Sequence, residues 1–237
     1  MPHTWTDALE KYRYPVDLQG FADAGHYPGW FEVNIYPGDP LQTMGFETRF
    51  REQARDHLEA WAEVVFWKLY SIGSGRAART TRNLLARETA IEDLWARCMA
   101  YVERPDRGTF RAFRRKLGFA APVVATAATF PAFVCPRDFP MVDTQVARWA
   151  IQNHDRHRYA DVGGPDLQGV ESLPTVGVLR ESHWSFVESW IEWCRFTARE
   201  LGHRTGRVWR ARDVEMAVFT AQRRGLSLNP LSPGARW

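Results

Sequence analysis

The sequence predicts an all-α fold, because helical patterns recur along the chain and alternating strand patterns are nearly absent. Apolar residues repeat at spacings of three and four over several stretches, which is the period of an amphipathic helix. Glycine and proline stand between these stretches, where helices end and begin. The 237 residues include 45% hydrophobic and 14% aromatic residues, enough to bury one large core or two lobes that share one.

The N-terminal part begins irregularly. The first 45 residues are rich in proline, glycine and aromatic residues, so we expect irregular structure with a short extended piece over 31–36. An apolar stripe then predicts one long helix over 47–70, which 71–75 breaks. A further stripe predicts a helix over 91–102.

Two helices joined by a tight turn are predicted over 109–133. Thr109 can cap the first helix, and Gly118 suits the left-handed position just beyond its end. Pro122 suits the first position of the second helix, whose small residues allow close packing. Four basic residues crowd the end of the first helix: Arg111, Arg114, Arg115 and Lys116.

Asp143 follows an apolar turn and can cap the next helix. A long polar connection over 153–182 follows, of a kind that is usually functional or mobile. Two more helices are predicted over 184–201 and 213–224. We therefore expect three regions: an irregular segment over 1–45 that packs on the core, a central helical bundle over 46–152, and a C-terminal helical lobe over 153–237 that packs with the N-terminus.

Charge and cysteine content narrow the function classes. A net charge of +3 and a pI near 8.9 point weakly to a nucleic-acid partner. The three cysteines are widely separated, which argues against a disulfide framework, a zinc knuckle or an iron–sulfur loop, and no pattern indicates a cofactor. No leader-like or membrane-spanning apolar run occurs, so we expect a cytoplasmic protein with no membrane partner.

Two polar clusters have a structural and a functional interpretation. The arginines at 204, 207, 210 and 212 can form a solvated face, but a second basic cluster near a helix end favours phosphate contacts. The His154-Asp155 pair and His157 could pass for metal ligands. They lack a fourth converging ligand, so polar loop residues are the better interpretation and no metal is expected.

The order of helix, tight turn, second helix and a helix start reading Phe139-Pro-Met-Val-Asp-Thr-Gln-Val resembles the helix-hairpin-helix superfamily of base-excision DNA glycosylases. The resemblance implies a two-lobed fold with Asp143 in the cleft between lobes. It implies a monomer that flips a damaged or modified base out of DNA and excises it, leaving an abasic site. The segments 1–45 and 153–182 could shape a pocket for a bulky base, including modifications of viral DNA, which suggests phage defence.

The resemblance also implies DNA contacts. In the family the hairpin binds backbone phosphate through N–H groups at the turn and at the start of the second helix. Ala120 stands where the family usually has a second glycine, and Pro122 lies somewhat farther from Asp143 than usual. The residues expected to bind DNA are Arg114, Arg115, Lys116, Gly118, Phe119, Ala120 and Gln145.

Asp143 is the catalytic residue that the resemblance implies. Breaking an N-glycosidic bond builds positive charge on the sugar, and a carboxylate beside it stabilises that charge or helps activate water. Two charges ~4 Å apart at an effective dielectric of ~20 interact by about 4 kcal/mol, on the order of 10³ in rate. The helix N-terminus keeps the carboxylate ionised. Taken alone, Asp143 is better explained as an ordinary helix cap, and the catalytic interpretation depends on the neighbouring hairpin.

Glu63, in Ala-Glu-Val, lies where the resemblance implies an acid that protonates the departing base. The match is short, and a solvated or salt-bridged glutamate is the better interpretation of this position. Trp67, Lys68 and Tyr70 are candidates for the base pocket or its rim, and the two aromatic residues equally suit the core. Pro122 stands where bifunctional members carry a nucleophilic lysine, so we expect a monofunctional enzyme. A DNA-binding protein that lacks the chemistry, or an all-α scaffold unrelated to DNA, remain the alternatives.

Overall fold

The computed structural model describes residues 4–14, 38–70, 74–86, 90–119, 123–160 and 163–231. Within those ranges every regular element is a helix, and strand-like pairing is limited to isolated bridges such as the antiparallel one between Val123 and Arg180. The all-α prediction is therefore confirmed. The extended piece expected over 31–36 lies outside the described residues.

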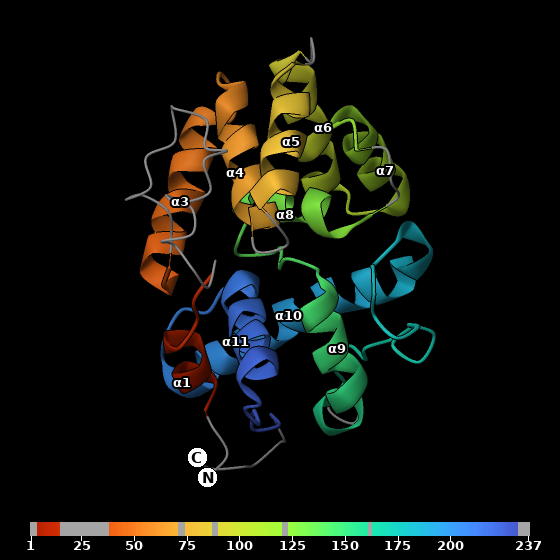
Figure 1. Cartoon of the computed structure of the whole chain (residues 1–237). Helices are drawn as coiled ribbons and strands as arrows, with labels where there is room; N and C mark the ends of the chain where they lie inside the picture. The colour runs from red at the N-terminus through yellow and green to blue at the C-terminus, as the bar shows by residue number, and fades with distance from the viewer. Residues whose placement is uncertain are drawn as a thin grey trace.

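The helices form two groups, one above the other in Figure 1. The upper group is built from the middle of the chain, and its helices pack through aromatic residues such as Trp61, whose ring centroid lies 4.8 Å from that of Phe130. Its members are α3 (Pro40–Gln53), α4 (Leu58–Tyr70), α5 (Ser74–Leu85), α6 (Ile91–Glu103), α7 (Arg107–Lys116) and α8 (Ala125–Val134).

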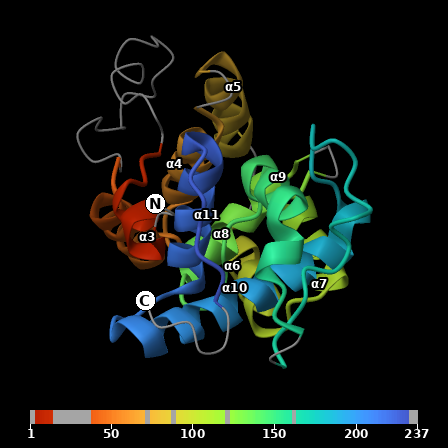
Figure 2. The same ribbon diagram turned by 90° about the horizontal axis from the view of Figure 1, so that it is seen from below.

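The lower group brings both ends of the described chain together. Its α11 lies between α1 and α9, and α10 crosses behind them (Figures 1 and 2). The indole N–H of Trp5 donates to the carbonyl of Asn229 at 2.9 Å, so α1 packs against the C-terminal end of the described chain. The members are α1 (Trp5–Glu10), α9 (Thr144–Asn153), α10 (Trp184–Thr205) and α11 (Ala211–Arg224), with short 3-10 turns η2 (His154–His157) and η4 (Glu181–His183).

A buried ion network joins the two groups. Glu47 of α3 is fully enclosed and accepts from Arg210 at 2.7 Å, and its other oxygen lies 3.2 Å from Nε of Arg212. Arg212 also pairs with Glu215 on the next turn of α11. Buried charges of this kind require partners, so the network fixes α3 against α11.

Three expectations about the helices were wrong. The single helix expected over 47–70 is two helices, because the chain turns at 54–57 and the Trp61 indole N–H donates to the carbonyl of Ala54 at 2.7 Å. The helix α5 was not predicted, since its buried face consists largely of small residues, which give a weak apolar stripe. Asp106 rather than Thr109 caps α7, and Thr109 completes a capping box with it.

The turn after α7 also differs from expectation. Gly118 has φ of +73°, so its predicted left-handed role is confirmed. The next helix begins at Ala125 instead of Pro122, because Val123 pairs with Arg180 in the isolated bridge and the Val124 N–H donates to the carbonyl of Leu179 at 3.1 Å. Pro122 itself lies outside the described residues.

The connection over 153–182 packs against the rest of the protein through buried side chains. Six apolar or aromatic side chains among its described residues are buried, namely Tyr159, Leu167, Val170, Leu173, Val176 and Leu179. The helix groups divide near Asp143 and not at residue 152, because α9 packs on α11 in the lower group. Asp143 thus stands where the chain passes from one group to the other.

Candidate active site

Asp143 caps α9, as predicted. It precedes the helix in an extended conformation, and its Oδ1 accepts the backbone N–H of Gln145 at 2.9 Å and of Val146 at 3.1 Å. These bonds satisfy two of the N–H groups that a helix start leaves without partners. The carboxylate is therefore held rigidly at the junction of the two helix groups.

The other carboxylate oxygen of Asp143 meets a lysine of α4. Nζ of Lys68 lies 3.1 Å from Oδ2, and the two side chains are only 6% and 11% exposed. The ammonium also lies 3.8 Å from Sδ of Met141 and 5.6 Å from the ring centroid of Tyr14. Most of its surroundings are protein, so the pair is strongly shielded from water.

Both members of the pair are charged. Burial acts to raise the pKa of Asp143, but the Lys68 ammonium and the two backbone N–H groups outweigh it and lower that pKa. Burial acts to lower the pKa of Lys68, but the Asp143 carboxylate outweighs it and raises that pKa. Nearby on α11, burial raises the pKa of Glu215 to about 7 despite the opposing effect of Arg212, and Asp143 adds to the increase.

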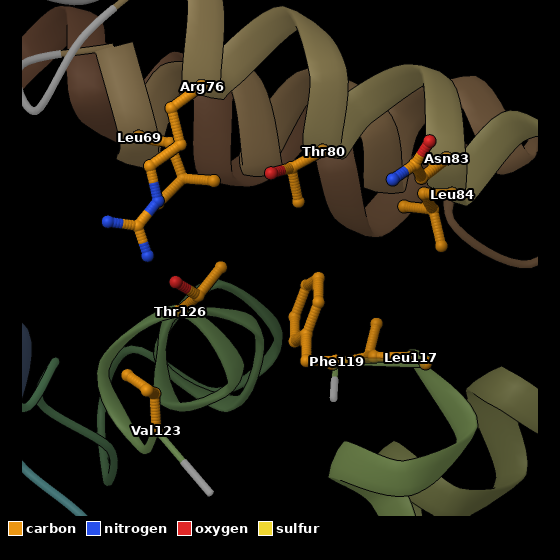
Figure 3. Close-up of a pocket in the computed structure, with 10 residues that line it drawn as sticks. Leu69, Arg76, Thr80, Asn83, Leu84, Leu117, Phe119, Val123 and Thr126 are labelled. Atoms are coloured by element: carbon orange, nitrogen blue, oxygen red, sulfur yellow. The ribbon is translucent and has the colours of Figure 1, made fainter. Parts of the chain in front are cut away.

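The pair lines a cavity of about 360 Å³ between the helix groups. Its wall is shared by α4, α5, α8, α9, α11 and the strand-like turn at 177–179. A neighbouring cavity of about 290 Å³ shares four of its lining residues, Leu69, Arg76, Val123 and Thr126. Figure 3 shows this second hollow between α5 and the turn that follows α7. The Asp143 cavity thus continues toward Gly118, which lines the second hollow.

The expected base-pocket residues are only partly brought to this cavity. Lys68 lines it, but Trp67 is fully buried in the core, 4.6 Å from the ring centroid of Tyr14. Tyr70 is half-buried with its ring 5.9 Å from Phe66 and lines neither cavity. Glu63 also lies outside both, and its carboxylate pairs with Arg49 at 3.1 Å. The structure therefore agrees with the salt-bridged interpretation of Glu63.

Most of the basic residues at the end of α7 make ion pairs within the protein. Arg114 is buried and donates to Glu181 at 2.7 Å and to the carbonyl of Phe119 at 3.0 Å. Lys116 pairs with Asp93 at 2.6 Å. These two side chains hold neighbouring elements together, and their ion pairs compete with the DNA contacts expected of them. Arg115 is exposed and remains a candidate for such a contact.

The remaining expected DNA contacts are divided between the two cavities. Gly118 and Phe119 line the second hollow, where Figure 3 shows the Phe119 ring below α5. Gln145 lines the cavity of Asp143. Ala120 lies outside the described residues.

The other polar clusters are structural where they are described. Arg210 and Arg212 belong to the buried network with Glu47, which overturns their expected phosphate role. His154 pairs with Asp155 at 3.4 Å. Across the part of the chain that the structure describes, no group of three or more histidine, cysteine, aspartate or glutamate residues could hold a metal ion.

Two arginines at the cavity were missed by the sequence reasoning. Arg76 of α5 and Arg223 of α11 both line the hollow that contains Asp143. Arg76 was missed because its helix was not predicted. Arg223 lies in the last turn of α11, where basic residues are common, so its position carried no distinct signal.

No protein-family model, curated protein or solved structure matches the chain. None of the described helices has both the length and the apolar character that a membrane crossing requires. The helix-hairpin-helix resemblance therefore depends on the sequence of 109–146 alone.

Proposed function

We propose that the protein is a monofunctional DNA glycosylase, which flips a damaged or modified base out of DNA, excises it and leaves an abasic site. The observation that carries the proposal is the buried Lys68–Asp143 pair, 3.1 Å apart, on the wall of a cavity that continues to the turn after α7. An everted nucleotide needs such a hollow, with charged groups placed beside its sugar and base.

The charges of the pair oppose those that the reaction develops. When the C1′–N bond breaks, its electron pair goes to the base nitrogen, so the sugar becomes positive and the base negative. With Asp143 facing the sugar and Lys68 facing the base, each charge is stabilised more in the transition state than in the ground state. The shielded position of the pair strengthens both interactions, because the effective dielectric is lower than in water.

Water completes the reaction. Its oxygen bonds to C1′ on the face opposite the departing base, and its two hydrogens end on the abasic sugar hydroxyl and, through solvent, on the base. Asp143 is poorly suited to removing that proton, because both of its oxygens already accept hydrogen bonds and its pKa is lowered. Its role is therefore electrostatic.

Lys68 is a poor nucleophile, because its amine is protonated. A Schiff base needs a neutral amine, whereas burial is outweighed by the Asp143 carboxylate and the pKa of Lys68 is raised. The amine of Lys68 therefore stays protonated at neutral pH. This supports hydrolysis without strand cleavage.

The arrangement of α7, the turn at Gly118, α8 and the start of α9 supports a two-lobed helix-hairpin-helix fold, in the order that the resemblance implies. In this proposal the upper and lower helix groups are the two lobes, and DNA is the partner of a monomeric protein. Exposed Arg115 and the backbone of the Gly118 turn contact phosphate there.

A non-catalytic DNA-binding protein is the second candidate. The observation in its favour is that both oxygens of Asp143 are already satisfied, by two backbone N–H groups and by Lys68. In this candidate the sole role of Asp143 is to cap α9 and to join it to α4. The cavity would then hold a base without breaking its bond.

The two candidates separate in one experiment. Purified wild-type protein and Asp143→Asn are incubated with duplexes that carry a panel of lesions and natural base modifications, and alkali-labile sites and released bases are measured by mass spectrometry. The enzyme predicts base release by the wild type alone, with duplex binding retained by the variant. Binding by both proteins without release of any base from the panel supports the non-catalytic candidate.

A further inference from the structure

We infer that Arg76 and Arg223 form a phosphate clamp at the mouth of the Asp143 cavity, gripping the DNA backbone on either side of an everted nucleotide. This inference takes one element from the proposed function, which is that DNA presents an everted nucleotide to the cavity. The two arginines come from opposite helix groups, Arg76 from α5 and Arg223 from α11, yet both line the same hollow. A strand laid across the junction would meet both.

Both arginines are available for a ligand. Their side chains are exposed, and neither makes an ion pair with any residue that the structure describes. Arg223 lies over the ring of Phe219 at 5.7 Å, a contact that holds the guanidinium plane without neutralising its charge. Arg76 extends from α5 into the space above Thr126 (Figure 3).

The basic residues that the hairpin resemblance assigned to phosphate are different, because two of them are already held in ion pairs. Arg114 is taken up by Glu181, and Lys116 by Asp93. A protein that binds DNA through the face of Asp143 therefore needs other cations there, and Arg76 and Arg223 lie at that face.

The charge of the cavity also suits a phosphodiester. Three cationic side chains and one carboxylate line it, and Lys68 neutralises Asp143 deep in the wall. The uncompensated positive charge is therefore at the mouth, on Arg76 and Arg223. Guanidinium groups match phosphate oxygens with two parallel hydrogen bonds.

Helix stability does not account for Arg76. It stands in the first turn of α5, where the partial positive charge of the helix disfavours a cation. A bound phosphate reverses this cost, because the helix start and the guanidinium then attract the same anion. Arg223, in the last turn of α11, has a favourable position for its helix, so Arg76 carries the stronger signal.

The test compares two matched double variants. Arg76→Gln/Arg223→Gln removes the clamp, and Arg79→Gln/Arg224→Gln removes the same charge from exposed positions of the same two helices that line neither cavity. Binding is measured on a duplex with a tetrahydrofuran abasic-site analogue and on the same duplex unmodified, from about 50 to about 200 mM salt. Thermal unfolding confirms that all the variants are folded.

The clamp variant should lose about two units of the salt slope on the abasic duplex, and its affinity there should fall on the order of tenfold to a hundredfold. Its preference for the abasic over the unmodified duplex should disappear, whereas the control pair should keep that preference. Equal losses in the two double variants, or equal losses on the two duplexes, overturn the clamp.

The readout is binding, so it is independent of catalysis. If the clamp variant loses binding as expected but the wild type releases no base, the clamp proposal stands and the glycosylase proposal fails. Base release by a protein whose clamp and control variants bind alike would remove the clamp and leave the glycosylase.

Discussion

Nζ of Lys68 and Oδ2 of Asp143 lie 3.1 Å apart, although the residues are 75 positions apart in the chain. Lys68 belongs to the upper helix group and Asp143 stands at the start of the lower one. The pair therefore joins the two groups at the cavity where we place the chemistry. Substitutions at these positions should affect both stability and activity.

Replacing Asp143 with asparagine should slow base release on the order of 10³-fold, since about 4 kcal/mol of charge stabilisation is lost. Single-turnover rates on a substrate from the lesion panel measure this. The asparagine side chain can still cap α9, so duplex affinity should change by less than about threefold. A variant that keeps a tenth or more of the wild-type rate would show that the charge of Asp143 is not needed.

Replacing Lys68 with methionine should destabilise the protein by about 3–5 kcal/mol, because the Asp143 carboxylate then stays buried without a cation. Adding Asp143→Asn to that variant should recover a large part of the loss, as the second substitution removes the unpaired charge. Urea unfolding of the wild type, both single variants and the double variant gives the coupling free energy. Additive losses would mean that the two groups do not interact in solution.

The free energy of unfolding should fall as pH rises through the range in which Glu215 titrates. Burial raises the pKa of Glu215 from 4.5 to about 7, so between these values the folded protein retains a proton that the unfolded chain has released. Stability is lost over that interval and levels off above it. Glu215→Gln should reduce the decline by on the order of 1–3 kcal/mol.

Urea unfolding at about pH 5 and about pH 8 measures this decline. The matched control is Glu188→Gln, an exposed glutamate of α10, which should decline as the wild type does. The prediction fails if Glu215→Gln and the wild type lose the same free energy between the two conditions.

Sequence reasoning located the features that depend on neighbours in the chain. The cap at Asp143 and the left-handed Gly118 need only residues a few positions away, and both were predicted correctly. The all-α class follows from local periodicity for the same reason. The break between α3 and α4 was missed because the apolar stripe continues through it, and the turn depends on packing by Trp61.

The site could be predicted only in part, because its pairings cross long distances in the chain. Arg114 has the sequence environment of a solvated arginine, but it meets Glu181, which lies 67 residues away. Likewise, nothing near Lys68 indicates that its partner is Asp143, so it was predicted as part of a base pocket and not as the partner of Asp143. Charge patterns along a helix identify which face is basic, but not which acids fold against it.

Lys68 should not attack the sugar itself. Borohydride traps a Schiff base covalently, so an enzyme that uses a lysine nucleophile becomes linked to DNA in its presence. The wild type should form no such adduct at about pH 7, because the Asp143 carboxylate outweighs the effect of burial and raises the pKa of Lys68. The measurement is a denaturing gel of protein with substrate duplex and borohydride, scored beside base release.

The Asp143→Asn variant sharpens the test, since loss of the carboxylate leaves burial to lower the pKa of Lys68. An adduct that appears in that variant, disappears in Asp143→Asn/Lys68→Met and is absent from the wild type would show that the ion pair suppresses lyase chemistry. Trapping of the wild type would instead make Lys68 a nucleophile and overturn the monofunctional proposal.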